Sequence, residues 1–456
     1  MTTHKRLFGT NGIRGIPGRD LTLEFISEMG LSIGSFFGKG DILIGFDGRN
    51  SSPSISRAIA AGMMESGLDI TDAGLIPTPA LQLAIRNLSY NGGVMITASH
   101  NPSEYNGIKA LSPSGVEITR DDEIELENIY YEKRYRRVKW NEVGHRGHDE
   151  KVIKNYIDSV VKHVDSQRIR DRKLTIVIDV GNGAQALSAP YIAERLGCRV
   201  ITLNGHVDGN FPGRGGEPTP DTLRDLSESV KVYGADIGVG YDGDGDRSIF
   251  CDEKGEIFWG DKSGTLITGH VLESKRVAPV VTTIATSLIV DEIVKRYGSQ
   301  VFRTRVGSVD VSYKMQEVNA IFGLEENGGC FYAPHMEVRD GGMATALMLE
   351  LLAYSKKTLS SLLAELPSFF QSKTRFSCPI EKATMVLDII AKDAKGKVDK
   401  IDGVKIWEDD HSWILLRPSG TEPLLRLFGE SNDIMRLEKM MSQYSDKVKS
   451  IMKTLS

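Results

Sequence analysis

The chain has 456 residues, more than one hydrophobic core usually holds, so its length favours about three domains. Hydrophobic residues make up 40% of the chain and charged residues 26%, a balance typical of soluble globular proteins that excludes a fibrous or globally disordered chain. The 56 basic and 61 acidic residues leave a net charge of -5, which argues against a bulk nucleic-acid binder.

The N-terminus and the cysteines indicate where the protein works. Residues 1–6 are polar and lead straight into the chain, without the apolar segment of a signal peptide, and no apolar run approaches the roughly 18 residues that span a bilayer. The four cysteines are scattered and form no Cys-x-x-Cys pair. We therefore predict a cytoplasmic protein with reduced cysteines and no membrane partner.

Three stretches of the chain share one order of elements: an apolar strand, a turn, a helix, a glycine and a second apolar strand. In the first stretch, the predicted strand is 41–46, the helix is 55–65 and the second strand runs from 68. In the second stretch, the strand is 174–179, the helix ends near 196 and the second strand is 198–203. In the third stretch, the strand is 279–284, the helix is 287–297 and the second strand is 301–302. This order is typical of a βαβ unit, whose strands pair in parallel around the crossover helix. The repeat predicts three related α/β domains.

The rest of the chain divides more simply. Residues 120–147 are polar, charged and aromatic, which indicates a helix and a connector without a strand at the end of the first domain. Residues 366–373 look like a boundary before a smaller last domain. That domain should contain short strands and a terminal amphipathic helix, with the strands at 404–407, 413–416 and 424–428 and the helix from Asp433.

A serine follows a later strand of the first stretch. The strand at 92–96 runs into Thr97-Ala-Ser99-His100-Asn101-Pro102. A serine at the end of a parallel strand faces the crevice where open α/β sheets bind ligands, so Ser99 is a candidate nucleophile with His100 beside it. Ser, Asn and Pro also form ordinary turns, and the residue types alone favour that simpler interpretation.

Three aspartates follow the corresponding strand of the second stretch. Asp242, Asp244 and Asp246 alternate with glycines, and Arg247 comes next. Three carboxylates so close together repel one another unless a cation lies among them, and hard oxygen ligands suit Mg²⁺ or Ca²⁺. The sixth position of an EF-hand loop requires glycine, whereas this loop has Arg247 there. The sequence therefore predicts Mg²⁺, with a phosphate oxygen or water completing its coordination.

Two further loops carry polar side chains. In the third stretch, Glu325 and Asn327 follow a strand, where they suit sugar hydroxyl groups, although a polar surface turn fits this segment equally well. In the last domain, strand 413–416 leads into a loop of two hydroxyl groups and successive backbone N–H groups, with arginines on both sides. Such a loop is an anion-binding nest, which favours phosphate over a plain turn. Its predicted phosphate ligands are Arg417, Ser419, Gly420, Thr421 and Arg426.

Two nucleotide motifs are not supported. Residues 181–186 fit a relaxed dinucleotide fingerprint, but the strand after the helix ends at Leu203-Asn204 with no acidic residue for a ribose. Residues 34–40 are too short for a P-loop and lack its Ser or Thr, so a nucleotide-driven kinase is not indicated.

Taken in order, these loops resemble those of the α-D-phosphohexomutase superfamily, which comprises phosphoglucomutases, phosphomannomutases and phosphoglucosamine mutases. The resemblance covers essentially the whole chain. It includes residues 8–15, similar to the N-terminal signature and containing Arg14, and residues 106–109, similar to the segment with an active-site lysine, here Lys109. The family fold implies an α/β protein of four domains around a central cleft. The first three would be related α/β domains with mixed sheets, and the last a small α+β domain, at residues 1–148, 149–252, 253–367 and 368–456.

The resemblance implies that the protein interconverts hexose 1-phosphates and hexose 6-phosphates of mannose, glucose or glucosamine. Ser99 would carry a phosphoryl group as phosphoserine, and a hexose 1,6-bisphosphate would be both intermediate and activator. Mg²⁺ would be held by the three aspartates and an oxygen on Ser99. Arg14 and Arg247 would contact the phosphoryl group, Lys109 or His100 would transfer the proton, Glu325 and Asn327 would bind the sugar, and the Arg417 loop would anchor the other phosphate.

One departure bears on the acid or base. Several family members have Ser-Gly-His in the sugar loop, where this chain has Asn327-Gly328-Gly329, which leaves Lys109, His100 or the nearby His335 for that role. A metal-dependent sugar-phosphate phosphatase and a non-catalytic sugar-phosphate sensor remain alternatives, and a homodimer through the first domain is an expectation at the level of the family.

Overall fold

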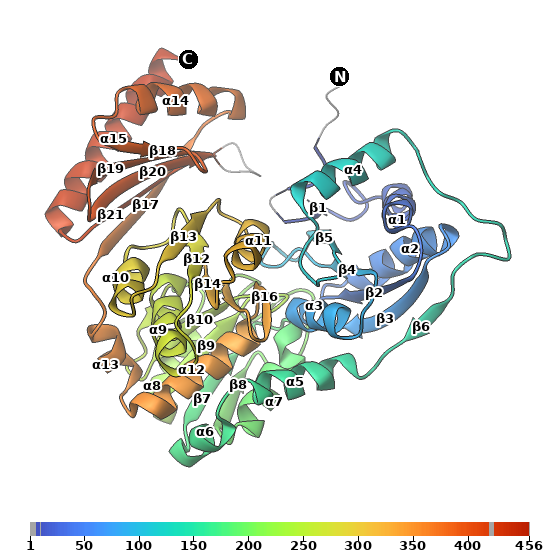
Figure 1. Ribbon diagram of the computed structural model, residues 1–456, viewed down its shortest axis with the longest axis horizontal. Coiled ribbons are helices and arrows are strands. Elements are labelled where there is room, and N and C mark those ends of the chain that lie inside the picture. The colour runs from blue at the N-terminus through green and yellow to red at the C-terminus, as the bar shows by residue number, and fades with distance from the viewer. Residues whose placement is uncertain (1–5, 10, 419–423, 456) are drawn as a thin grey trace.

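The computed structural model describes residues 6–9, 11–418 and 424–455. Four sheets follow one another along the chain, and they lie in four bodies (Figure 1). The first body is at the right of the view, the second and third are side by side below, and the fourth stands apart at the upper left. This arrangement confirms the predicted fold of three mixed α/β domains and a small C-terminal α+β domain.

The first sheet has six strands in the order β1-β5-β4-β2-β3-β6. Its strands are β1 (Ile13–Gly15), β2 (Asp41–Phe46), β3 (Asp69–Leu75), β4 (Gly92–Ile96), β5 (Asn106–Leu111) and β6 (Arg146–His148), and its helices are α1 (Leu23–Phe37), α2 (Ser52–Glu65), α3 (Thr78–Asn87) and α4 (Arg120–Tyr131). The prediction that residues 120–147 contain no strand was wrong at the end of the range. The short, exposed β6 pairs in parallel with β3 and extends the edge of the sheet.

The second and third sheets repeat the first. The second, ordered β11-β10-β9-β7-β8, contains β7 (Thr175–Asp179), β8 (Arg199–Leu203), β9 (Ile237–Tyr241), β10 (Ser248–Asp252) and β11 (Ile257–Phe258). The third, ordered β13-β12-β14-β15-β16, contains β12 (Val280–Thr283), β13 (Val301–Thr304), β14 (Phe322–Leu324), β15 (Cys330–Tyr332) and β16 (Met336–Arg339). In each, three parallel strands continue into antiparallel ones, as β3-β2-β4 continue into β5-β1.

The helices of these two domains pack on both sides of their sheets (Figure 1). They are α5 (Val152–Lys162), α6 (Ser166–Arg172), η1 (Ala184–Leu187), α7 (Ala189–Arg195) and α8 (Arg224–Tyr233), then α9 (Gly260–Ser274), α10 (Ile289–Arg296), α11 (Ser308–Val318), α12 (Gly341–Ser355) and α13 (Leu359–Ala364). The single helix predicted to end near 196 is instead a 3₁₀ turn followed by α7. The second element begins at Ala189 and has Pro190 in its first turn, a position that suits a proline although its ring cannot continue a preceding helix.

The fourth sheet is antiparallel throughout, in the order β17-β21-β20-β19-β18. Its elements are β17 (Phe370–Ser377), β18 (Lys397–Asp399), β19 (Val404–Asp409), β20 (Ser412–Pro418), β21 (Leu424–Ser431), α14 (Ile380–Lys392) and α15 (Ile434–Thr454). The predicted terminal helix begins as expected, because the Asp433 side chain accepts hydrogen bonds from the backbone of Met435 and Arg436.

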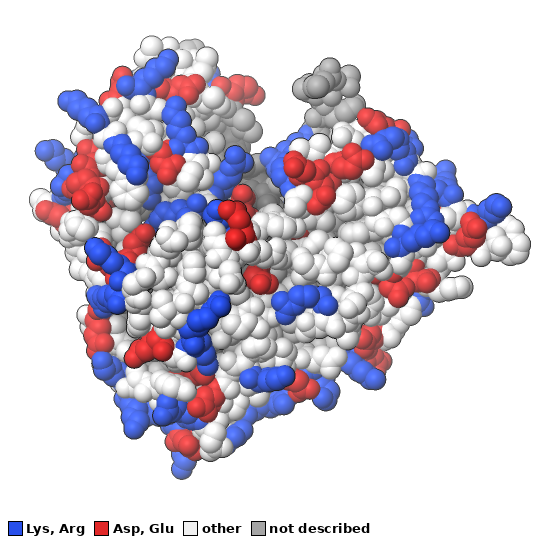
Figure 2. Space-filling view, viewed as in Figure 1, with Lys and Arg blue, Asp and Glu red and all other residues white. Residues whose placement is uncertain are grey.

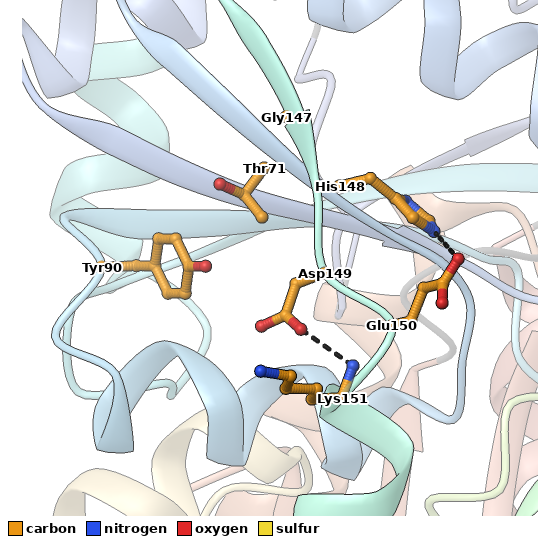
Figure 3. A pocket seen from close by; sticks show the side chains of 7 residues that line it. All are labelled: Thr71, Tyr90, Gly147, His148, Asp149, Glu150 and Lys151. Atoms are coloured by element: carbon orange, nitrogen blue, oxygen red, sulfur yellow. Dashed lines mark hydrogen bonds and ion pairs between the residues drawn. The ribbon is translucent and has the colours of Figure 1, made fainter.

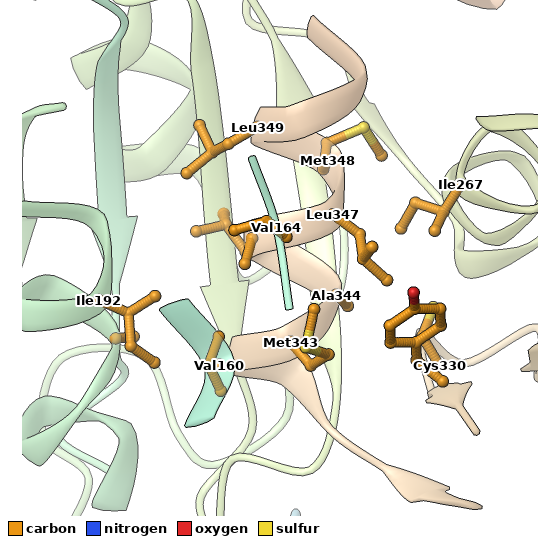
Figure 4. Close-up of a cluster of buried hydrophobic side chains, with 14 of the residues drawn as sticks. Val160, Val164, Ile192, Ile267, Cys330, Met343, Ala344, Leu347, Met348 and Leu349 are labelled. Atoms are coloured by element: carbon orange, nitrogen blue, oxygen red, sulfur yellow. The ribbon is translucent and has the colours of Figure 1, made fainter. Parts of the chain in front are cut away.

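One buried cluster joins the first three domains. It runs from Leu43 to Leu362 and centres on α12, in which every residue from 341 to 353 is buried. Figure 4 shows Met343, Leu347 and Leu349 of α12 among side chains of the second and third domains, and such a helix without a polar face belongs inside a core. The fourth domain has its own cluster and meets the third through a smaller apolar patch, made of Ile284, Ala285, Leu288, Trp413, Leu415 and Phe428.

The domain boundaries stay predictions. β11, which pairs with β10 in the second sheet, lies just beyond residue 252, the predicted end of the second domain.

Candidate active site

Ser99 lies on a tight loop between β4 and β5 and is completely buried. Its backbone has a φ of 51°, in the left-handed region that non-glycine residues seldom adopt. Its hydroxyl donates a hydrogen bond to Asp242 Oδ2 at 2.7 Å, and His100 Nδ1 lies 3.3 Å from the Ser99 hydroxyl oxygen. The backbone N–H of Ser99 donates to Thr97 Oγ1 at 2.8 Å. The predicted nucleophile therefore points at the predicted metal loop.

Asp242, Asp244 and Asp246 form a compact acidic triad in the turn between β9 and β10. All three are buried, and one carboxylate oxygen from each lies within 4.8 Å of the others. The intervening glycines permit this packing, because a Cβ atom at Gly243 would lie 2.6 Å from the carbonyl oxygen of Ser99. Within the described chain, Asp244 Oδ1 and Asp246 Oδ1 have no hydrogen-bond partner. Buried carboxylate oxygens left in this way fit a hard divalent cation such as Mg²⁺.

Three basic side chains surround the triad. Lys109 Nζ, on β5, lies 3.2 Å from Asp244 Oδ2 and 3.7 Å from Asp246 Oδ2. Arg339, at the end of β16, donates to Asp246 Oδ2 at 2.6 Å. Arg247 Nε is farther away, at 3.9 Å from Asp242 and 3.8 Å from Asp246. Lys109 comes from the first domain and Arg339 from the third, so three domains contribute to one charge cluster.

The aspartates differ in their protonation behaviour. Burial, followed by the charges of Asp246 and Asp244, raises the pKa of Asp242 well above its usual value. Burial also opposes the ionisation of Asp244, but Lys109, the Thr78 hydroxyl and Arg339 together hold its pKa far below the usual value. Thr78 Oγ1 donates to Asp244 Oδ2 at 2.7 Å. Asp244 is therefore ionised at neutral pH, whereas Asp242 retains a proton more readily than an ordinary aspartate.

His100 and Arg14 lie next to the serine. The charge of Arg247, then burial and Arg14, depress the pKa of His100 strongly, so its imidazole is neutral. Arg14 Nη1 donates to Asn101 Oδ1 at 2.5 Å, and burial, with Arg247, lowers its pKa to about 10. At neutral pH, Arg14 is thus a charged donor and His100 a proton acceptor.

The predicted sugar loop is joined directly to the metal loop. The N–H of Ser248 donates to the carbonyl oxygen of Gly328 at 3.1 Å. Glu325 is buried, its Oε2 lies 3.5 Å from Arg339 Nη1, and burial raises its pKa. Asn327 is partly buried and uses its side-chain carbonyl to accept from the N–H of Gly329 at 3.1 Å.

His335 does not join the site. It is buried between Tyr156 and His163, with Nε2 3.2 Å from Asp340 Oδ2 and Nδ1 3.3 Å from the Ser159 hydroxyl. The suggestion that His335 supplies the missing acid or base of the sugar loop was therefore wrong. Its short distance from that loop in sequence is misleading, because β15 and β16 turn the chain away.

The predicted phosphate loop lies on the fourth domain. Arg417 Nε donates to Asp402 Oδ2 at 2.5 Å, and the same oxygen accepts from the N–H of Val306 in the third domain. Arg426 is directly opposite Arg417 on one neighbouring strand and Arg375 on the other. Like charges opposite one another are unfavourable without an anion. The other three predicted ligands (Ser419, Gly420 and Thr421) lie outside the described residues. Figure 2 shows a notch between this lobe and the first domain.

A surface hollow lies elsewhere, where the chain passes from the first domain to the second. Its volume is about 640 Å³, and Figure 3 shows the side chains that line it: Thr71, Tyr90, His148, Asp149, Glu150 and Lys151, with Gly147. None of the predicted site residues is among them. Its charged groups interact locally, as in the 3.9 Å contact of His148 Nε2 with Glu150 Oε1.

The sequence analysis did not predict two residues that contact the acidic triad, Arg339 and Thr78. Arg339 ends a strand, and Thr78 begins α3, where a threonine before a proline reads only as a helix start. Neither residue lies in a loop whose amino-acid composition indicates a binding or catalytic site. The available signal was their position near the end of a strand, with Arg339 before Asp340 and Thr78 after Pro77.

Comparison with known proteins defines the class. Models of the phosphoglucomutase/phosphomannomutase family match the chain four times in order: α/β/α domain I at residues 5–137, domain II at 154–255, domain III at 259–370 and the C-terminal domain at 376–446. The chain belongs to this family.

Particular relatives agree with that assignment. The chain is 41% identical to a phosphoglucosamine/phosphogalactosamine mutase of Sulfurisphaera tokodaii, over 94% of this chain and 96% of that protein. It is 40% identical to a phosphoglucomutase/phosphomannomutase of Thermococcus kodakarensis, over 93% and 94%. The crystal structure of a phosphoglucomutase/phosphomannomutase family protein from Burkholderia thailandensis superimposes with a TM-score of 0.88 at 27% identity, covering 98% of this chain and 97% of that one.

None of the helices in the described part of the chain has the length and apolar content needed to span a membrane.

Proposed function

We propose that this protein interconverts hexose 1-phosphates and hexose 6-phosphates by carrying a phosphoryl group on Ser99. The observation that supports this most directly is the 2.7 Å hydrogen bond from the Ser99 hydroxyl to Asp242, inside a buried acidic triad. The named relatives, mutases for glucosamine, galactosamine, glucose and mannose phosphates, supply the substrate class.

The residues around Ser99 divide the work of phosphoryl transfer. The triad and an oxygen on Ser99 would hold Mg²⁺, which supplies neutralisation of the transferring group when bound. Arg14 and Arg247 would contact the phosphoryl oxygens, and phosphoryl transfer depends mainly on such positioning and charge. Arg339, paired with Asp246, adds a third guanidinium at the same place.

His100 and Lys109 share the proton transfer in this proposal. Neutral His100 lies within reach of the Ser99 oxygen and accepts a proton there. Burial acts against the charge on Lys109, but Asp244 and Asp246 outweigh it and raise its pKa, so Lys109 stays a cation and a proton donor.

The remaining residues orient the substrate. Glu325 and Asn327 would bind sugar hydroxyl groups beside the triad, and Arg417, Ser419, Gly420, Thr421 and Arg426 would anchor the phosphate that does not react. An anchor on a different domain would let a bisphosphate bind in two orientations. Phosphoserine at Ser99 and a hexose 1,6-bisphosphate activator belong to the same proposal, as does a homodimer, which light scattering would test.

A phosphatase is not favoured. Ser99 is completely buried, which keeps bulk water away from a phosphoryl group on it, and the named relatives are mutases. A sensor would not require a buried nucleophile hydrogen-bonded to a metal-binding carboxylate.

Phosphorus NMR tests the function. The protein is incubated with Mg²⁺ and a trace of hexose 1,6-bisphosphate, and with the 1-phosphates of glucosamine, glucose or mannose in separate samples. Appearance of a 6-phosphate that depends on Ser99 supports the proposal and ranks the sugars. Release of inorganic phosphate in its place, or no conversion of any sugar by fully phosphorylated protein, contradicts it.

A further inference from the structure

Arg49 lies beneath the Ser99 loop and is buried almost completely. It follows β2 by three residues and uses its whole guanidinium group. Nε donates to Asp47 Oδ2 at 3.1 Å, and the four other bonds go to backbone carbonyl oxygens. Nη1 donates to the carbonyl oxygens of Pro102 at 2.6 Å and Tyr105 at 2.9 Å. Nη2 donates to those of Ser99 at 2.8 Å and Asn101 at 2.7 Å. A guanidinium has five N–H donors, so none remains for a phosphate.

These contacts fix the backbone that presents the nucleophile. The four carbonyl groups belong to residues 99–105, the loop in which Ser99 adopts its left-handed conformation. Asp47 extends the support, because Thr97 Oγ1 donates to its Oδ2 at 2.7 Å and accepts from the N–H of Ser99. A backbone in a sparsely populated conformation persists only where its surroundings hold it.

The second domain contains an equivalent pair of a buried aspartate and an arginine that donates to backbone carbonyl groups. Asp179 ends β7, the strand equivalent to β2, and Arg214 Nε donates to its Oδ2 at 2.8 Å. Arg214 also donates to the carbonyl oxygen of Tyr241 at 2.5 Å. Tyr241 is the residue immediately before Asp242, so Arg214 supports the start of the metal loop as Arg49 supports the serine loop.

The segments that carry Arg49 and Arg214 contact each other at the boundary between the first and second domains. The Phe211 ring lies 5.0 Å from the Arg49 guanidinium, and Asn50 Nδ2 donates to Asn210 Oδ1 at 3.1 Å. A Cβ atom at Gly48 would lie 2.4 Å from Val207, so the turns are packed without spare room. The two reactive loops are thereby held relative to one another.

We propose that Arg49 is a positioning residue for phosphoryl transfer, which sets the place of Ser99 through the loop backbone, with Arg214 as its counterpart for the metal loop. The proposal rests on the function proposed above, in which Ser99 carries the phosphoryl group. Neither arginine contacts the substrate.

The test compares Arg49→Lys with Arg214→Lys. A lysine keeps the positive charge but has only three donors, fewer than the five acceptors around Arg49 or the four around Arg214. We expect Arg49→Lys to lower kcat roughly 100-fold, the cost of a misplaced reacting group, with KM and the half-saturating Mg²⁺ concentration within about threefold of wild type. Arg214→Lys should raise the half-saturating Mg²⁺ concentration roughly 10- to 100-fold. Arg195→Lys, at an exposed ion pair with Asp158, is the matched control that changes neither.

Opposite results would overturn the proposal. If Arg49→Lys raised KM with kcat unchanged, Arg49 would be a substrate ligand. If both arginine variants changed kcat and Mg²⁺ dependence alike, the two arginines would contribute only to general stability.

Thr97→Val, in which valine has nearly the shape of threonine, replaces Arg49→Lys if that variant does not fold. We expect Thr97→Val to lower kcat and leave KM unchanged.

A second measurement separates this proposal from the proposed function. Hydrogen exchange of the amides at residues 97–106 should be faster in Arg49→Lys and unchanged in Arg195→Lys, whether or not wild type converts any hexose phosphate. Unchanged exchange in Arg49→Lys contradicts the positioning role, whereas an inactive wild type with faster exchange in the variant contradicts only the mutase.

Discussion

Around Ser99, charged side chains of three domains are buried and paired with one another, whereas Arg417 and Arg426 belong to a fourth domain with a separate core. The first group is fixed by the large cluster around α12. The second reaches the rest of the protein through a small apolar patch and the contact of Asp402 with Val306. The difference shows that the groups around Ser99 share one core, whereas Arg417 and Arg426 are held by a core of their own.

The largest effect should come from Ser99. Ser99→Ala removes the group proposed to carry the phosphoryl, and we expect conversion of hexose 1-phosphate to fall by roughly 10⁴-fold or more. Ser99→Thr keeps a hydroxyl, but a β-branched residue is strained at a φ of 51°, so it should recover little of the rate. Phosphorus NMR measures both. Substantial turnover by the alanine variant would refute a covalent role for Ser99.

The next effect concerns the metal. Thr78→Val preserves shape but removes the hydroxyl that holds Asp244 Oδ2 at 2.7 Å. We expect the half-saturating Mg²⁺ concentration to rise roughly 10- to 100-fold, as for other residues that orient metal ligands. Activity measured against Mg²⁺ concentration shows this, with saturating Mg²⁺ restoring most of kcat. An unchanged Mg²⁺ dependence would mean that Asp244 is not a ligand.

The fourth domain should respond differently. Arg417→Ala would remove the charge-assisted bond proposed to anchor the distal phosphate, so KM for the hexose phosphate should rise roughly tenfold while kcat falls much less. Steady-state kinetics on both sugar phosphates measure the two constants. A variant that lost kcat at unchanged KM would mean that Arg417 acts in phosphoryl transfer and not in binding the distal phosphate.

The smallest effect is a pH dependence at the junction of the third and fourth domains. Burial, with the nearby charge of Glu326, raises the pKa of Asp261 to about 7, so the folded state binds its proton more tightly than the unfolded chain does. Stability is therefore lost as pH rises from the ordinary pKa of an aspartate to about 7. Asp261→Asn should raise Tm by a few degrees at pH 8 and change it less at pH 5. An equal change at both pH values would exclude the titration of Asp261 as the cause.

The sequence predicted the elements whose signals are local. Ser99 and the three aspartates could be found because each follows an apolar strand, and the carboxyl ends of parallel strands gather at one edge of a sheet. The fold class was confirmed through the repeat of strand, helix and strand. β6 escaped prediction because three exposed polar residues carry no strand pattern of their own and pair only because β3 offers an edge.

What the sequence could not predict is contact between domains. Arg339 reaches Asp246 across 93 positions of the chain and Thr78 reaches Asp244 across 166. Such pairings depend on how whole domains pack, which no periodicity records. His335 illustrates the reverse error, because nearness in sequence suggested a role that the turn between β15 and β16 excludes.

The core around α12 also determines how the protein can be made. Its members extend from Leu43 to Leu362, so the first domain cannot complete its packing until α12 and α13 have left the ribosome. At ordinary rates of translation that interval is on the order of tens of seconds, during which apolar surface of the early domains stays exposed to solvent. The fourth domain, with its own core, can then fold last and alone. Nascent chains of this protein should therefore engage chaperones until about residue 362, and much less afterwards.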